Sequence, residues 1–282
     1  MSTEILPAGP PSEPPVQPPV EPETAAPPTK KRRGWLIALI VLGVLVVLGI
    51  IAFIVAESFA KDYARDYVRG KIVDVLQLPA DAEVDVDLGA GSIILQALAG
   101  RIETVDVDVP DATFGALTGT LSLHGEGVPL DETAPVDTLR VDFAIGADDL
   151  AALSEDPSTA PTFAFEGDQV ALGSEFELFG AVIPIGLTLD PSAADGALVL
   201  TPTSITIGEQ TFESGSEDGS FLGQIASALL QPQTLCIAGS VPQALVLDDA
   251  AIDGDELVLT FRGDGAALGG PELATPGTCP AA

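Results

Sequence analysis

The sequence has few of the residues on which most enzymes and nucleic-acid-binding proteins depend. It contains one histidine, two cysteines and no asparagine, and 11 lysines and arginines stand against 42 aspartates and glutamates. The absence of asparagine excludes N-linked glycosylation. The net charge of −31 belongs to residues 57–282, because acids and bases balance before them. Such a surface repels nucleic acid and anionic head groups, so no nucleic-acid partner is expected, and neither is electrostatic adhesion to an anionic bilayer. Solubility of an apolar-rich exported domain explains most of these carboxylates.

The motifs of common catalytic sites are also missing. There is no G-x-S-x-G elbow, no P-loop and no G-x-G-x-x-G after a strand. His124 falls in the polar phase of a predicted strand, so it is expected to face solvent. The cysteines form no C-x-x-C pair, and the acid pairs lack the calcium-loop pattern. We therefore predict no enzyme activity, no metal and no cofactor, with a hydrolase as the most distant alternative.

One long apolar run determines the topology. Residues Trp35 to Val55 form 21 consecutive uncharged residues, directly after the tetrad Lys30, Lys31, Arg32, Arg33. At about 1.5 Å per residue this run spans a bilayer core of about 30 Å. Because basic residues stay on the cytoplasmic side, we predict a cell-membrane protein with a cytoplasmic tail (1–33), a transmembrane helix (34–56) and an extracytoplasmic domain (57–268).

A cleaved signal peptide is the alternative reading of the same run. Ala56-Glu57-Ser58 loosely fits a cleavage site. The apolar part of a signal peptide usually has about 7–15 residues, and this run is longer. A retained anchor is therefore favoured, and cleavage stays open.

The N-terminal tail is rich in proline. Residues 1–29 contain ten prolines, a composition that cannot bury a core and favours disordered polyproline II structure. A solvated spacer is the simpler interpretation, and docking of a cytoplasmic partner is the alternative.

After the anchor, the hydrophobic period changes from helical to alternating. Residues 57–78 repeat apolar side chains at three- and four-residue steps, which predicts an amphipathic helix. Further helices are expected at 147–153 and 221–230, and 92–98 is ambiguous between strand and helix. Strict alternation predicts antiparallel strands within 84–88, 102–109, 117–123, 139–143, 163–166, 176–178, 205–207, 245–247 and 257–261. The predicted fold class is α+β and β-rich, a curved antiparallel sheet wrapped on amphipathic helices.

Two further features concern the covalent structure and the apolar surface. In an oxidising compartment, Cys236 and Cys279 are expected to form a disulfide that ties down the tail 269–282 and contributes about 4 kcal/mol in the chain-entropy model. Few, short helices cannot cover a long sheet completely, so an apolar groove that holds lipid chains is expected. Its candidate lining residues are Phe114, Phe143, Phe163, Phe165, Phe176, Phe179, Phe212 and Phe221.

Two segments carry a resemblance to a known family. Ser92–Val109 (SIILQALAGRIETVDVDV) and the closing pattern from Val241-Pro242 to Leu257-Val-Leu-Thr-Phe-Arg-Gly263 resemble the LmeA-like phospholipid-binding proteins of the actinobacterial cell envelope. The resemblance covers roughly residues 35–265 and rests on apolar packing patterns. It implies an extracytoplasmic phospholipid-binding protein connected with envelope lipid or lipoglycan assembly, and a tubular lipid-binding-like fold. It supplies no catalytic residues.

Two functions follow as hypotheses. In the first, a membrane-anchored protein holds phospholipid acyl chains in the groove, and Arg101 is a candidate for the head group, although it could equally pair with a surface acid. In the second, a non-enzymatic envelope scaffold has a closed core and carries no lipid. An apolar cavity separates the two.

Overall fold

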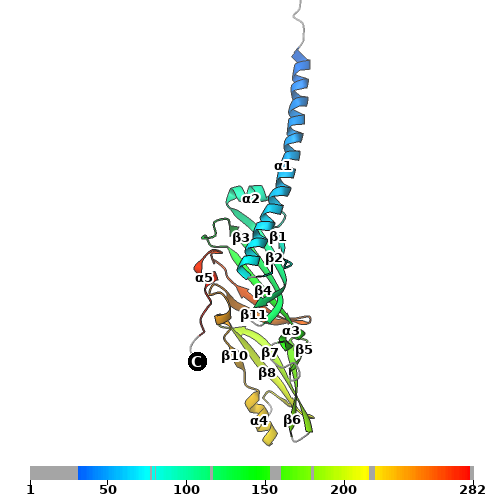
Figure 1. The fold of residues 1–282 in the computed structure, drawn as a ribbon, viewed down its shortest axis with the longest axis vertical. Coiled ribbons are helices and arrows are strands. Elements are labelled where there is room, and N and C mark those ends of the chain that lie inside the picture. Colours follow the sequence, from blue (N-terminus) through cyan, green and yellow to red (C-terminus); the bar gives the residue numbers. More distant parts are fainter. Residues whose placement is uncertain are drawn as a thin grey trace, which may run out of the picture. The chain divides into compact units, whose positions relative to one another are not determined.

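The computed structural model describes residues 31–76, 78–79, 81–114, 117–152, 160–178, 181–215 and 220–279. The proline-rich tail before residue 31 lies outside the described residues. The chain divides into two units, Met1–Ala52 and Phe53–Ala282. One helix, α1 (Lys31–Leu76), belongs in part to each unit (Figure 1). Within the described residues it is the one helix long and apolar enough to cross a membrane.

The first unit consists, where it is described, of the first part of α1. From residue 41 to residue 52 every side chain of α1 is apolar and exposed. A helix that is apolar on all sides and uncovered is the form that a chain takes in lipid, because all its backbone hydrogen bonds are made within the helix.

The second unit contains two antiparallel sheets. The first sheet has the order β1-β2-β3-β4-β12-β11. Its strands are β1 (Asp85–Asp87), β2 (Arg101–Phe114), β3 (Leu117–Pro129), β4 (Thr138–Gly146), β12 (Glu256–Arg262) and β11 (Val246–Asp253). The last two strands form a hairpin through Gly254, whose φ of 62° suits a tight turn. This hairpin pairs with β4, with Leu259 opposite Phe143.

The second sheet is inserted in the sequence between β4 and β11. Its order is β10-β8-β7-β6-β5, and β9 pairs with β8. Its strands are β5 (Thr162–Glu166), β6 (Gln169–Leu178), β7 (Ala181–Ala194), β8 (Ala197–Ile207), β9 (Gln210–Glu213) and β10 (Gln233–Leu235). Strand β11 contacts both β7 and β8, so the inserted sheet packs on the C-terminal hairpin.

Short helices connect the strands. They are α2 (Ile93–Ala99), α3 (Ala147–Ala151), α4 (Phe221–Leu229), η1 (Ala238–Ser240) and α5 (Pro271–Ala274). Helix α4 begins after Ser220, whose Oγ accepts a hydrogen bond from the Gly223 N–H at 3.0 Å. Such a cap satisfies one of the free N–H groups at a helix start.

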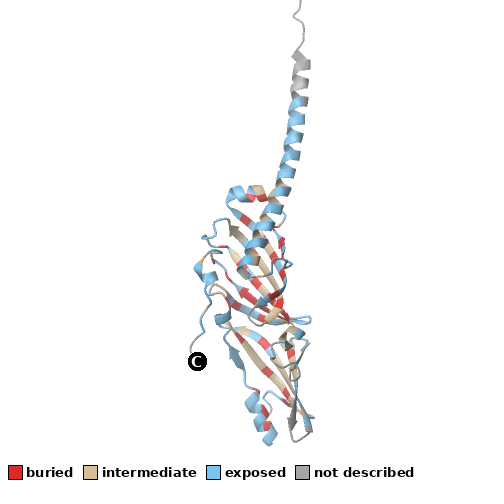
Figure 2. Ribbon diagram, viewed as in Figure 1, coloured by how far each residue is buried: buried red, intermediate tan, exposed pale blue. Residues whose placement is uncertain are grey.

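The larger hydrophobic core lies on the first sheet, where the strands alternate buried and exposed residues (Figure 2). Helix α1 packs against this core through Ala60, Ala64, Val68 and Ile72, a stripe at four-residue steps. A smaller cluster on the second sheet joins Ile205 and Phe212 to Ala226 of α4 and to Leu230. Each cluster therefore has a helix beside a sheet.

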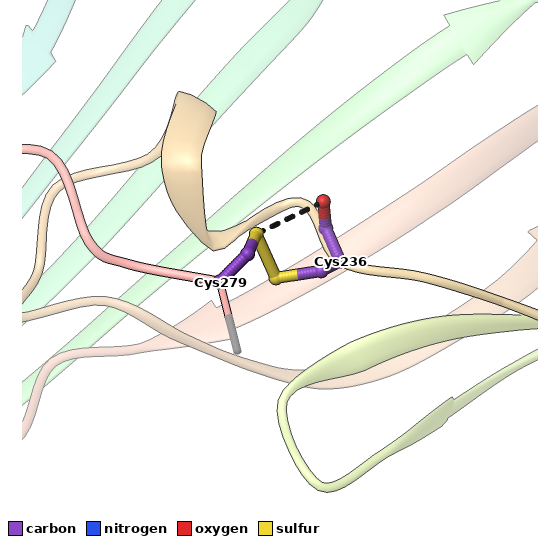
Figure 3. Close-up of a disulfide and its surroundings, with 2 residues drawn as sticks. All are labelled: Cys236 and Cys279. Atoms are coloured by element: carbon purple, nitrogen blue, oxygen red, sulfur yellow. Dashed lines mark hydrogen bonds between the residues drawn. A yellow bond between two sulfur atoms is a disulfide. The ribbon is translucent and has the colours of Figure 1, made fainter. Parts of the chain in front are cut away.

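The C-terminal tail is fixed by covalent and backbone bonds. Cys236 and Cys279 form a disulfide, with their Cα atoms 5.8 Å apart (Figure 3). The Cys279 Sγ also lies 3.4 Å from the Cys236 carbonyl oxygen, which is a contact only, because a disulfide sulfur has no proton to donate. The Gly277 N–H donates to the Val241 carbonyl at 2.9 Å. Both bonds hold the part of the tail that follows α5.

The predicted fold class is confirmed, since antiparallel sheets dominate and helices accompany them. Two details differ from the sequence prediction: the strands form two sheets, and strands β7, β9 and β10 were not predicted. The segment 92–98, which the sequence left open between strand and helix, is helical.

Candidate functional site

An open apolar cleft of about 420 Å³ lies between α1, α2, the start of β2 and the segment after β3. All of these residues belong to the second unit. The cleft is lined by Ala60, Tyr63, Ala64, Ile93, Ile94, Ala97, Leu98, Ile102 and Leu130. Its size falls within the range of small-molecule pockets, about 300–1,000 Å³.

Small residues on α1 make room for this cleft. Ala60 and Ala64 face α2 and the core, where a larger side chain would fill the space. Phe59 and Tyr63 project instead to the outside, and 72% and 74% of their surface is exposed. The aromatic residues of α1 therefore lie outside the core, while alanines approach it.

Helix α2 forms the opposite wall and is tied at its N-terminus to α1. Glu57 accepts hydrogen bonds from the Ser92 Oγ and the Ile93 N–H, both at 2.6 Å. The Ser92 Oγ also accepts from the Leu95 N–H at 3.3 Å, which makes Ser92 the N-cap. A carboxylate at this position satisfies free N–H groups and suits the positive end of the helix.

The other end of α2 is equally well defined. Gly100 ends the helix with a φ of 78°, a left-handed conformation that glycine adopts without strain. The buried Gln96 side chain accepts a hydrogen bond from the Glu103 N–H at 2.8 Å, joining α2 to β2. Ile93 is also buried and, together with Ile102, forms the floor of the cleft.

The cleft has no Asp, Glu, His, Lys, Arg or Cys side chain in its lining. The phenol of Tyr63 is the single polar side-chain group among the lining residues. The other lining residues are aliphatic, so the cleft can bind an apolar chain through van der Waals contacts.

A polar cluster lies next along α1. The Tyr67 hydroxyl donates to Glu132 at 3.2 Å, and the Lys71 Nζ lies 3.1 Å from the same carboxylate. The hydrogen bond from Lys71 and its positive charge lower the pKa of Glu132. This cluster attaches α1 to the segment that follows Leu130, and so supports one edge of the cleft.

The predicted groove phenylalanines do not line this cleft. Phe143 is buried in the larger core and Phe212 in the smaller one. Phe163 and Phe165 are half-buried on β5, and Phe221 on α4 is 77% exposed. The side chains of Phe114, Phe176 and Phe179 lie outside the described residues. Contact of any of these residues with lipid stays a prediction.

Arg101 is engaged with protein groups. Its guanidinium pairs with Asp137 and donates to the Gly127 carbonyl at 3.2 Å. It directly precedes Ile102 of the cleft floor, so it lies near the cleft without lining it. Its role toward a head group stays a prediction.

Sequence reasoning missed the cleft residues for an identifiable reason. The segment 92–100 is free of charge, and its leucines do not fit a helix with a polar outer face. That excess of apolar residues was the available signal. The cleft forms because α1 approaches α2, and the hydrophobic pattern of neither segment predicts this contact.

Among the described residues, no group of three or more His, Cys, Asp or Glu side chains is placed to hold a metal ion. No curated protein and no solved structure matches the chain. The sequence pattern of one family, described as LmeA-like phospholipid-binding, matches residues 55–262. This match covers most of the chain, including both walls of the cleft and both sheets. The chain therefore belongs to the LmeA-like phospholipid-binding family.

Proposed function

We propose that this protein is a single-pass membrane protein whose extracytoplasmic domain binds phospholipid by holding part of an acyl chain in the cleft between α1 and α2. The N-terminal tail lies in the cytoplasm, and the domain after the anchor lies outside the membrane. In this position the protein would support the assembly of cell-envelope lipids or lipoglycans.

The observation that carries this proposal is the chemistry of the cleft. Its lining is aliphatic apart from Tyr63, and it lies in a chain that belongs to a phospholipid-binding family. A volume of about 420 Å³ is at the low end of the range for small-molecule pockets. We therefore assign to it a segment of one chain, with the head group and the second chain outside.

The energetics favour exchange with the membrane over permanent storage. Moving a methylene from water into the cleft gains about 0.8 kcal/mol. Moving it from the bilayer gains almost nothing, because lipid tails are as apolar as leucine side chains. A lipid in the cleft would therefore exchange readily with the leaflet.

The anchor and its orientation rest on the sequence and on α1. The described residues 41–52 are apolar and exposed, as a membrane span requires. Lys30 to Arg33 precede this run, and basic residues remain on the cytoplasmic side.

A pair of alanine substitutions on α2 tests the cleft. Ala97 lines the cleft, whereas Ala99 is exposed on the same helix and does not. The full chain is placed in vesicles that contain a phospholipid with a photo-activatable group at one chain end. After irradiation, the yield of cross-links to Ile93 and Ile102, which are buried at the floor of the cleft, is measured by mass spectrometry.

The indole introduced by Ala97→Trp would occupy the cleft. The cross-linking yield of this variant is therefore expected to fall to background. Ala99→Trp is the matched control and should keep the yield of the unchanged protein. Equal yields from all three proteins would show that the lipid does not use the cleft.

A second candidate function is a scaffold for another envelope protein. The observation that favours it is α4, whose residues Phe221, Ile225 and Leu229 are exposed together on one helix. In that case the cross-linking yield would be low in every variant, and the search would turn to protein partners of α4.

A further inference from the structure

Five large apolar side chains are exposed on the elements that form the cleft. Phe59 and Tyr63 come from α1, Leu95 and Leu98 from α2, and Leu130 from the segment after β3. We call these five residues the apolar rim. Leu98 is 80% and Leu95 is 59% exposed. Large apolar side chains exposed on neighbouring elements are a candidate contact surface for a partner or a membrane.

Helix α2 is unusual for a helix at a water-exposed surface. From Ser92 to Gly100 it has no charged residue. Its buried side holds Ile93 and Gln96, so the polar glutamine is inside and leucines are outside. A surface helix in water shows the opposite arrangement. The outer side of α2 is therefore suited to an apolar environment.

The position of α2 along the chain identifies that environment. Glu57 holds the N-terminus of α2 through Ser92 and the Ile93 N–H. Glu57 follows Val55, the last residue of the apolar run, by two residues of the same helix. At about 1.5 Å per residue, this is about 3 Å along the helix axis. Helix α2 is thus fixed to α1 at the level where the apolar run ends.

The residue types around the rim agree with a membrane interface. Tyr63 and Tyr67 are the only two tyrosines in the sequence, and tyrosine is enriched where lipid tails meet head groups. Residues 61–101 contain five basic residues against seven acids, so they carry only a small part of the net charge of −31. The strongly acidic remainder of the domain would not be attracted to an anionic leaflet. The rim is therefore the part of this domain best suited to a bilayer.

We propose that the apolar rim inserts into the outer leaflet, so that the cleft opens directly into the acyl-chain region. Tyr63, Leu98 and Leu130 belong to both the rim and the cleft lining. An acyl chain can then enter the cleft without crossing water. This inference rests on the proposed anchor and deepens the proposed lipid binding by naming the lipid surface as the partner of the rim.

Leu95 is the position that tests rim insertion separately from lipid binding. It is exposed on α2 but does not line the cleft, so a lipid inside the cleft does not report on it. Leu95→Trp is made in the full chain with Trp35→Phe, which removes the only native tryptophan. The variant is placed in vesicles that contain phospholipids brominated at different depths along the chain. The control is Leu229→Trp in the same background, at an exposed position of α4.

The proposal predicts a blue-shifted emission at position 95 that brominated lipid quenches. Lipids brominated near the head group should quench it most, because interfacial helices enter only about 5–10 Å below the surface. Emission at position 229 should stay unquenched. Raising the salt concentration should leave the quenching at position 95 unchanged, since apolar insertion is not screened.

Equal, weak quenching at both positions would overturn rim insertion. A blue shift at position 95 without quenching would overturn it as well, and would indicate a protein surface or a second copy over the rim. The Ala97→Trp and Ala99→Trp pair reports on the cleft independently. If position 95 is quenched but Ala97→Trp and Ala99→Trp give equal cross-linking yields, the rim inserts and the cleft does not bind lipid. The two experiments therefore distinguish failure of lipid binding from failure of insertion.

Discussion

The pKa of His124, the only histidine in the sequence, reports on the electrostatics of the first sheet. The His124 Nδ1 lies 2.5 Å from Asp106 on the neighbouring strand, and Glu126 is the next acid along β3. The hydrogen bond to Asp106 is the main cause that raises the pKa of His124 above its usual 6.5, and burial opposes it only in part. The imidazole is about 42% exposed, so water screens this pair and its effect on stability is small.

We predict that His124 titrates above 6.5 in the folded protein, and that Asp106→Asn lowers the midpoint. A folded pKa above the unfolded one favours folding below about 6.5. The contribution disappears as the pH rises through the folded pKa. Because the chain has no other histidine, the imidazole NMR signal gives the midpoint without assignment. A midpoint at or below 6.5 that does not change in Asp106→Asn would contradict the hydrogen bond between His124 and Asp106.

Single residues were predictable from alternation to a useful extent. The polar phase of β3 predicted that His124 faces outward, and it is half-exposed on that face. The same alternation could not distinguish a phenylalanine that fills a core from one that lines a groove. Phe143 and Phe212 fill cores, because their neighbours come from distant strands and helices that close over them.

At the scale of elements, α2 shows how a distant residue can decide a local structure. Its seven residues are too short and too apolar to reveal a period. The helix is stabilised by a residue outside it. Glu57, which lies 35 residues before Ser92, accepts a hydrogen bond from the Ser92 hydroxyl. The sequence of α2 alone could not show this bond.

We predict that Glu57→Ala loosens α2. The substitution removes the carboxylate that accepts from the Ser92 hydroxyl and the Ile93 N–H, so amide exchange at the first residues of α2 should become faster. Hydrogen exchange with mass spectrometry on the full chain in a bilayer measures this rate. Asp62→Ala is the matched control, since Asp62 is exposed on the same helix and pairs only loosely with Arg65, at 3.8 Å. If both variants exchange alike, Glu57 does not hold α2.

Strand β7 was missed for a related reason. It contains Pro184 and Pro191, and proline within a run argues against an interior strand because it removes a ladder donor. Strands β6 and β8 nevertheless pair with β7 on both sides. Pairing with two neighbours outweighs the lost hydrogen bonds, and this gain is not visible in the local sequence.

At the scale of the whole molecule, the division into two sheets was beyond sequence reasoning. Alternation identifies the faces of a strand and not its partners. Residues 246–262 complete a sheet that begins with residues 85–146, and the second sheet is inserted between them. The predicted disulfide is present within this arrangement, where it holds the tail near the segment before β11.

The argument from incomplete coverage predicted an apolar groove between sheet and helices. An apolar cleft does lie between helices and the first sheet, and it is lined mostly by aliphatic residues of α1, α2 and β2. The amount of apolar surface could be estimated from composition. The place where it stays uncovered depends on how α1 meets α2, through alanines on one and an uncharged face on the other.

The most direct test of lipid binding is an NMR measurement on the full chain in nanodiscs, with isoleucine methyl groups labelled. Contacts between lipid acyl protons and each methyl are recorded. Ile50 and Ile54 in the apolar run serve as positive controls, and Ile145, buried in the core of the first sheet, is the negative control. The account predicts acyl-chain contacts at Ile93 and Ile102, which are buried at the floor of the cleft where a lipid on the surface cannot reach. Contacts at the apolar run with none at Ile93 and Ile102 would contradict it.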